Sequence, residues 1–316
     1  MERSGKLAWM VAAAVAVGLA HVGCPSPSTP KKEAFVANET WCPEGFEVGP
    51  QDTCFAIPDS HTVDAPILVY LHGPYTGHGS AEEWALVRAA VQRGFAVIVP
   101  RGKRGACAWT ADLKDHFCWP REPEDTKAIK GAVREWDKVL WQVEALLEGD
   151  THKRFVLGDG NGGSFAAHLA THGYFSASAW GVLHGGALAP SPHGGEPTSP
   201  IVMVTTPTDA ATHTKVLGLR DQLRRANWPH HLCTRAGGTE LTSQDVDIVL
   251  RYFKRIANGK RPEAPEGATC EGGGNLGARP PGPDGGAPRG DGGAPKRGPA
   301  RPDGGAPTPK AAPARP

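Results

Sequence analysis

Residues 154–170 contain the spacing in this chain that most clearly suggests chemistry. An apolar run at residues 155–157 gives way to Gly158-Asp159-Gly160-Asn161-Gly162-Gly163, and apolar and small residues then resume at helical spacing. This pattern predicts a strand, a very sharp turn and a helix. Enzymes that use such a turn display a serine at its tip, with small residues two positions before and after it. Here the flanks are Gly158 and Gly162 but the tip is Gly160, so the turn is predicted without the residue that it exists to display.

Ser164 is the alternative nucleophile, because Gly162 and Ala166 flank it at the same two positions. It follows Leu157 by seven residues, however, whereas the turn requires its nucleophile almost at the strand end. We therefore predict that Ser164 lies in the first turns of the helix, as an ordinary surface or backbone-bonded hydroxyl. An esterase that uses Ser164 with an unassigned histidine, for example His184, is the competing hypothesis.

Asp159 and His184 have plainer interpretations than catalysis. Asp159 would be a poor nucleophile, since Leu157 and Asn161 would clash as its flanks, and a carboxylate at a helix N-terminus is explained by the helix dipole. His184 follows a predicted strand, where a structural histidine with satisfied hydrogen bonds is the commoner case.

Strands and helices alternate through the middle of the chain. Apolar runs predict strands at residues 53–57, 66–71, 95–99, 155–157, 177–183, 201–204 and 230–234, and helical spacing predicts helices at 81–93, 125–148, 210–225 and 243–256 besides the one after the turn. Such alternation implies a mostly parallel sheet with helices on both faces. The fold class is therefore α/β, with a single domain at residues 41–271.

The strand order, the His72-Gly73 turn after the first buried strand and the sharp turn at Gly160 together resemble the α/β-hydrolase superfamily. The resemblance is to secreted esterases of the feruloyl-esterase and polyhydroxybutyrate-depolymerase type, and it spans residues 53–256. In that family the turn commonly reads Gly-Phe-Ser-Asn-Gly-Gly, so Asn161, Gly162 and Gly163 match while Asp159 and Gly160 depart.

The resemblance also assigns the other catalytic positions. Asp209 falls at the acid position, although it could equally be a helix N-cap. Glu240 stands where Gly-Gly-Thr-His would supply the histidine, and backbone amides near Gly73 and Asn161 would form the oxyanion hole. Glycine offers no oxygen and a serine needs an imidazole to take its proton, so two of three triad parts are missing. The resemblance thus implies a non-catalytic pocket that could still bind a small-molecule or ester-like ligand.

The N-terminus has the layout of an export signal. Basic residues precede an apolar run at residues 7–20, and Val22-Gly23-Cys24 follows it. Small residues before a cysteine resemble the lipobox of bacterial lipoproteins, although His21 stands where leucine is usual. We expect a signal peptide at residues 1–23, lipidation of Cys24, a polar linker at 24–40 and a location in the cell envelope as an outer-membrane lipoprotein. Ordinary cleavage, giving a periplasmic or secreted protein, is the alternative.

Cysteine usage supports export. Seven cysteines leave one over if six are paired, and Cys24 is the natural odd one. Proximity in sequence suggests disulfides between Cys42 and Cys54, Cys107 and Cys118, and Cys233 and Cys270, among 15 possible pairings. None has C-x-x-C spacing, and we expect neither a metal nor a cofactor.

Two further segments stand outside the alternating pattern. The loop at residues 101–123 is long, so it is stapled or functional, and its Trp109, Phe117 and Trp119 could line the mouth of a cleft. Residues 272–316 are rich in Gly, Pro and Ala and repeat Asp-Gly-Gly-Ala-Pro three times, which predicts a disordered tail. With a net charge of +1, nothing indicates a nucleic-acid partner.

Overall fold

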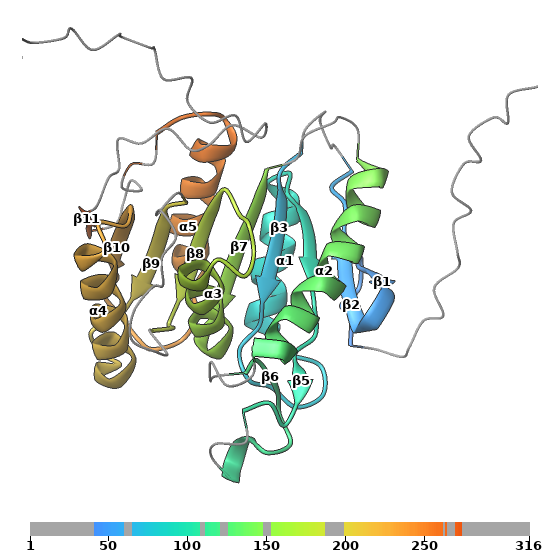
Figure 1. Ribbon diagram of the computed structural model, residues 1–316, viewed down its shortest axis with the longest axis horizontal. Coiled ribbons are helices and arrows are strands. Elements are labelled where there is room, and N and C mark those ends of the chain that lie inside the picture. The colour runs from blue at the N-terminus through green and yellow to red at the C-terminus, as the bar shows by residue number, and fades with distance from the viewer. Residues whose placement is uncertain are drawn as a thin grey trace, which may run out of the picture.

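A computed structural model describes residues 41–59, 65–107, 111–120, 126–147, 153–186, 199–261, 263 and 269–273. Within them a nine-stranded sheet has the order β1-β2-β4-β3-β7-β8-β9-β10-β11, with helices packed on it (Figure 1). The strands are β1 (Glu47–Gly49), β2 (Thr53–Ala56), β3 (Ile67–Leu71), β4 (Ala96–Val99), β7 (Arg154–Asp159), β8 (Ala179–Leu183), β9 (Ile201–Thr205), β10 (His230–Thr234) and β11 (Thr269–Gly273). Every pairing from β4 through β10 is parallel, and β2 and β11 pair antiparallel with their neighbours.

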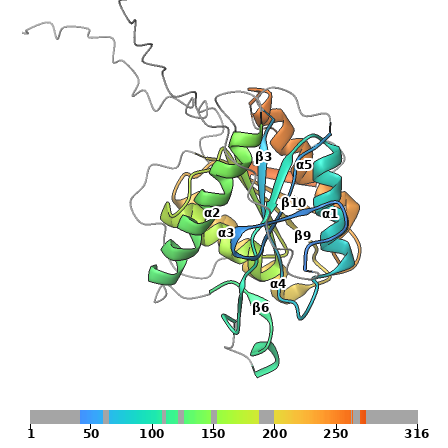
Figure 2. The ribbon, with the colours of Figure 1, turned by 90° about the vertical axis from the view of Figure 1, so that its right-hand side faces the viewer.

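Helices cover both faces of this sheet, as the alternating sequence predicts. The helices are α1 (Ala81–Gln92), α2 (Thr126–Leu146), α3 (Gly160–His172), α4 (Ala210–Arg225) and α5 (Ser243–Ala257). One apolar cluster joins α2, α3 and α4 to the sheet, and a second joins α1 and α5 to it, so the two sets lie on opposite faces (Figures 1 and 2). Successive residues of β3 alternate between the clusters, with Val69 in the first and Tyr70 in the second, because side chains of a strand alternate in direction.

The predicted elements exist, with ends that differ by at most two residues, and the α/β prediction is confirmed. Three pieces of structure were not predicted. The edge strands β1 and β11 have no apolar alternation, and β5 (Lys103–Arg104) with β6 (Phe117–Cys118) forms a small hairpin inside the long loop. Because β11 extends to Gly273, the first two residues assigned to the tail belong to the sheet. The remaining tail and residues 1–40 lie outside the described residues.

All three predicted disulfides are present. Cys42 bonds Cys54 of β2, Cys107 bonds Cys118 of β6, and Cys233 of β10 bonds Cys270 of β11. Each joins a peripheral segment to the sheet or closes the long loop, and such bonds typically stabilise a fold by about 2–4 kcal/mol each. Three disulfides fit an extracytoplasmic protein. None of the described helices is both long and apolar enough to cross a bilayer.

Candidate functional site

The turn between β7 and α3 has the geometry that the glycines predict. Asp159 ends the strand and Gly160 begins the helix, with no residue between them. Gly160 has φ +52°, the left-handed region that a residue at the tip of this turn must adopt. A Cβ on Gly158 would lie 2.2 Å from the carbonyl oxygen of Gly162, and one on Gly162 would lie 2.0 Å from that of Leu71. Only glycine fits at the two flanks, and the turn has the backbone geometry of a nucleophile elbow.

The tip itself has room for a side chain. A Cβ on Gly160 would meet only the Pro74 side chain, at 4.0 Å. The flanking glycines are thus required by close backbone contacts, whereas glycine at the tip is not required by any contact. The tip presents backbone where the fold can hold a side chain.

Ser164, the alternative nucleophile, bonds to the backbone of a neighbouring segment. It lies in α3, as predicted, but it is buried rather than at the surface, and its hydroxyl accepts a hydrogen bond of 3.1 Å from the Gly186 amide. His184 Nδ1 is hydrogen-bonded to Asp159, and His184 Nε2 has no partner among the described residues. Ser164 and His184 are therefore not hydrogen-bonded to each other.

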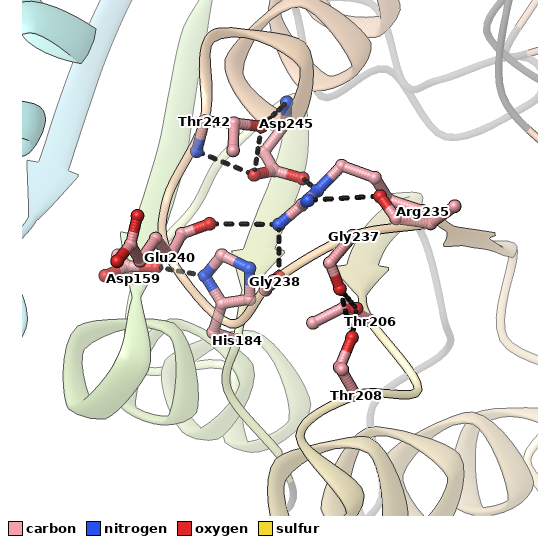
Figure 3. Close-up of polar contacts among 11 residues, drawn as sticks. Asp159, His184, Thr206, Thr208, Arg235, Gly237, Gly238, Glu240, Thr242 and Asp245 are labelled. Carbon is pink, nitrogen blue, oxygen red and sulfur yellow. Dashed lines mark hydrogen bonds and ion pairs between the residues drawn. The ribbon is translucent and has the colours of Figure 1, made fainter.

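Asp159 and His184 instead pair with each other (Figure 3). His184 Nδ1 lies 2.9 Å from Asp159 Oδ1, and His184 sits just after β8 with φ +47°. Asp159 stands at the N-terminus of α3, as the dipole interpretation requires, but the dipole alone is an incomplete interpretation because the carboxylate also contacts His184. His184 Nε2 is buried and has no hydrogen-bond partner among the residues that the structure describes, so the prediction of a satisfied His184 holds there only for Nδ1.

Charge around His184 favours its protonated form. Burial lowers the pKa of His184, but the hydrogen bond and negative charge of Asp159, with a contribution from Asp245, offset this and raise the pKa overall. The contact therefore strengthens as the imidazole gains its proton.

Asp209, at the acid position, is an N-cap. Its carboxylate accepts a hydrogen bond of 3.0 Å from the Thr212 amide at the start of α4. Thr212 holds the pKa of Asp209 below its usual range, and His184 adds a smaller effect in the same direction. Of the two interpretations left open by the sequence, the capping role is the one that the structure displays.

The loop that holds Glu240 is fastened by a buried cation. Arg235 pairs with Asp245 at 2.7 Å and also donates to the backbone oxygens of Gly238 and Glu240, at 3.0 and 2.9 Å (Figure 3). The Thr206 hydroxyl donates to the carbonyl of Gly237 in the same loop. The loop thus has a defined path while Glu240, which the resemblance aligns with the histidine position, is exposed.

The Gly73 amide, predicted as an oxyanion-hole donor, already has an acceptor. It donates to Glu83 Oε1 over 2.6 Å, and the same oxygen accepts from the Tyr70 hydroxyl at 2.8 Å. Burial and then the charge of Asp159 raise the pKa of Glu83. The sequence gives only an indirect signal for Glu83: it stands three residues after Ser80, a pattern that predicts a helix start, and Ser80 does cap α1.

Asn161 links the elbow to the long loop. Its side chain accepts from the Trp119 amide at 2.6 Å and donates to the Trp119 carbonyl at 3.2 Å. Trp119 is buried, stacks on Phe165 and donates to the His72 carbonyl, so the prediction that it lines a cleft mouth was wrong.

Phe117, in the same loop, is half-buried and stacks with Tyr75, and Trp109 lies outside the described residues. The loop is stapled at Cys107 and Cys118, as expected.

His72 orders the turn that it begins. Its Nδ1–H donates to the Gly73 carbonyl at 2.6 Å and its Nε2 accepts from the Gly102 amide at 2.8 Å. Burial lowers the pKa of His72 to about 3, with a partial offset from the Gly73 hydrogen bond, so the ring is neutral at pH 7. Among the described residues no three His, Cys, Asp or Glu side chains are grouped to hold a metal ion.

Comparisons with known proteins agree with this architecture. A scan against protein-family models finds no match, and neither does a search of curated proteins. Solved structures do match: a carboxylesterase from Mesorhizobium loti is 14% identical, with a TM-score of 0.52 over 67% of this chain and 99% of that one. The Bacillus cereus carboxylesterase is 16% identical, with a TM-score of 0.50 over 65% of this chain and 93% of that one. The chain therefore has the α/β-hydrolase fold, and at this identity the likeness concerns the fold alone.

Proposed function

We propose that this protein is an exported, lipid-anchored member of the α/β-hydrolase fold class that has lost serine-hydrolase chemistry and acts as a binding or envelope-surface protein. The observation on which the proposal rests is Gly160 at the tip of an otherwise intact elbow. Acyl transfer through this fold needs a hydroxyl at that point, an imidazole to take its proton and donors for the oxyanion.

The contact between Glu83 and Gly73 supports the same proposal. An oxyanion hole stabilises developing negative charge with backbone amides that are available when the charge appears. Here the Gly73 amide donates to a carboxyl group, so an incoming oxyanion would have to displace Glu83. The negative charge of Asp159, which contributes to raising the pKa of Glu83, would also oppose a second anion at the same place. Ser164, the alternative nucleophile of an active esterase, is buried and bonded to Gly186.

Back-mutation tests the mapping of these positions. The variant Gly160→Ser/Glu240→His should hydrolyse p-nitrophenyl acetate above the wild-type background. Adding Glu83→Ala should raise that rate further, because it removes the acceptor that occupies the Gly73 amide. Gly160→Ala/Glu240→His is the matched control, since it imposes the same backbone strain without a hydroxyl. Folded variants with no hydrolysis above the control would count against the mapping.

The anchor is tested separately. Cys24→Ala should move the protein from the membrane fraction to the soluble fraction after cell lysis, and it should abolish incorporation of labelled fatty acid. Unchanged fatty-acid incorporation would contradict lipidation at Cys24 and leave the interpretation of the elbow untouched.

A further inference from the structure

We propose that the outward face of α2 is a docking surface for an anionic lipid bilayer. This inference goes beyond the proposed function and does not depend on the state of the elbow. The face, here called the α2 stripe, consists of four cations and one tryptophan: Lys127, Lys130, Arg134, Lys138 and Trp141. All five side chains are exposed, and their spacing of three, four, four and three residues places them along one side of the helix.

Trp141 is the most unusual member of the stripe. Its side chain is 70% exposed. Among the described residues one other large apolar side chain is exposed, that of Leu146 on the same helix, at 48%. The opposite face of α2 is buried on the sheet through Ile129, Trp136 and Val143, so Trp141 is not needed for the core. An indole has an apolar body and a polar N–H, which suits it to the boundary between lipid headgroups and acyl chains.

Charge complementarity selects an anionic surface. Glu135 and Asp137 flank the stripe, but Glu135 pairs with Lys138 and also accepts from Gln51. Four cations against these two acidic groups leave the face net positive, although the whole chain has a net charge of only +1. Cations beside an interfacial tryptophan are the combination that binds an anionic leaflet.

The route by which the chain enters the domain favours the same occupant. Gln51, in the turn between β1 and β2, contacts Glu135 of α2, and Figure 1 shows β1 and β2 beside this helix. Trp41, where the described chain begins, follows Cys24 by 17 positions, and a chain of that length spans at most ~60 Å. A lipid at Cys24 would therefore hold α2 within reach of the bilayer, and two weak membrane contacts bind more stably than one.

Vesicle binding tests this proposal on the chain from residue 24 onward with Cys24→Ser, so that neither the apolar run at residues 7–20 nor a lipid anchor makes a contribution. Binding to phosphatidylglycerol-containing vesicles should fall at least about 10-fold in Lys127→Gln/Lys130→Gln/Arg134→Gln, because each cation near an anionic surface contributes appreciably. The matched control is Arg88→Gln/Arg251→Gln/Lys260→Gln, which removes three exposed cations on or beside α1 and α5, on the opposite face. The control should bind within about 2-fold of its parent.

A second measurement locates Trp141. Brominated lipids should quench part of the tryptophan fluorescence of the parent, and Trp141→Phe should remove that quenchable part while leaving thermal unfolding unchanged. Equal loss of vesicle binding in the α2 and control variants would overturn the proposal, as would equal binding to vesicles of phosphatidylcholine alone. If Cys24 proves not to be lipidated, both measurements still test the α2 stripe, because neither depends on a lipid anchor.

Discussion

Alanine substitution at the three elbow glycines separates the role of the flanks from that of the tip. In Gly162→Ala the new Cβ would lie 2.0 Å from the Leu71 carbonyl oxygen, and in Gly158→Ala 2.2 Å from the Gly162 carbonyl oxygen. Both obstacles are backbone atoms of adjoining elements, so the strand and helix must move apart. We expect each flank substitution to lower the free energy of unfolding by more than about 4 kcal/mol, in the range reserved for severe core disruption.

The tip should respond differently. Gly160→Ala introduces no contact closer than 4.0 Å and costs only the strain of a left-handed conformation at φ +52°, about 1–2 kcal/mol. Urea unfolding of the three variants, followed by far-ultraviolet circular dichroism, measures the difference. A flank variant as stable as Gly160→Ala would refute the assignment of this turn as a nucleophile elbow.

Three further predictions concern the groups that hold the site in place. The pKa of His72 is lowered to about 3, so the folded state binds fewer protons than the unfolded state between about pH 3 and 6.5. The stability that His72 contributes is therefore full above pH 6.5 and falls as the pH is lowered. Urea-unfolding curves should lose this pH dependence in His72→Gln. Arg235→Met should cost about 3–5 kcal/mol of unfolding free energy, because it leaves Asp245 buried and unpaired; a loss under about 1 kcal/mol would contradict a fastening role. Asn161→Leu removes two hydrogen bonds to Trp119 and should cost about 2 kcal/mol, with faster hydrogen exchange at the Trp119 amide, whereas unaltered exchange would argue against the link.

The main elements of the fold follow from local patterns in the sequence. Continuous apolar runs gave the central strands, because a strand buried on both faces needs no polar alternation. The edge strands were not predicted from the sequence. One of them, Thr269–Gly273, has little apolar character and is held by pairing with β10 and by the Cys233–Cys270 disulfide. His230 and His231 show the same limit: alternation predicts one exposed ring, but both are buried.

The candidate site was predictable only where backbone geometry determines residue type. The glycines at 158 and 162 follow from close contacts that any elbow of this kind makes, so sequence located the turn. The pairing of Asp159 with His184, and the use of the Gly73 amide by Glu83, join residues that are 25 and 10 positions apart. These contacts depend on how neighbouring strands are ordered in the sheet, which no local pattern states.

The reaction of the wild-type protein with a fluorophosphonate, read by intact-mass spectrometry, tests the central claim most directly. Such a reagent phosphonylates an activated serine irreversibly, and it needs no knowledge of the natural ligand. We expect no mass increase in the wild type or in Ser164→Ala, because the elbow presents Gly160 and Ser164 is buried against Gly186. Stoichiometric phosphonylation of the wild type that disappears in Ser164→Ala would contradict the account and establish an active serine hydrolase.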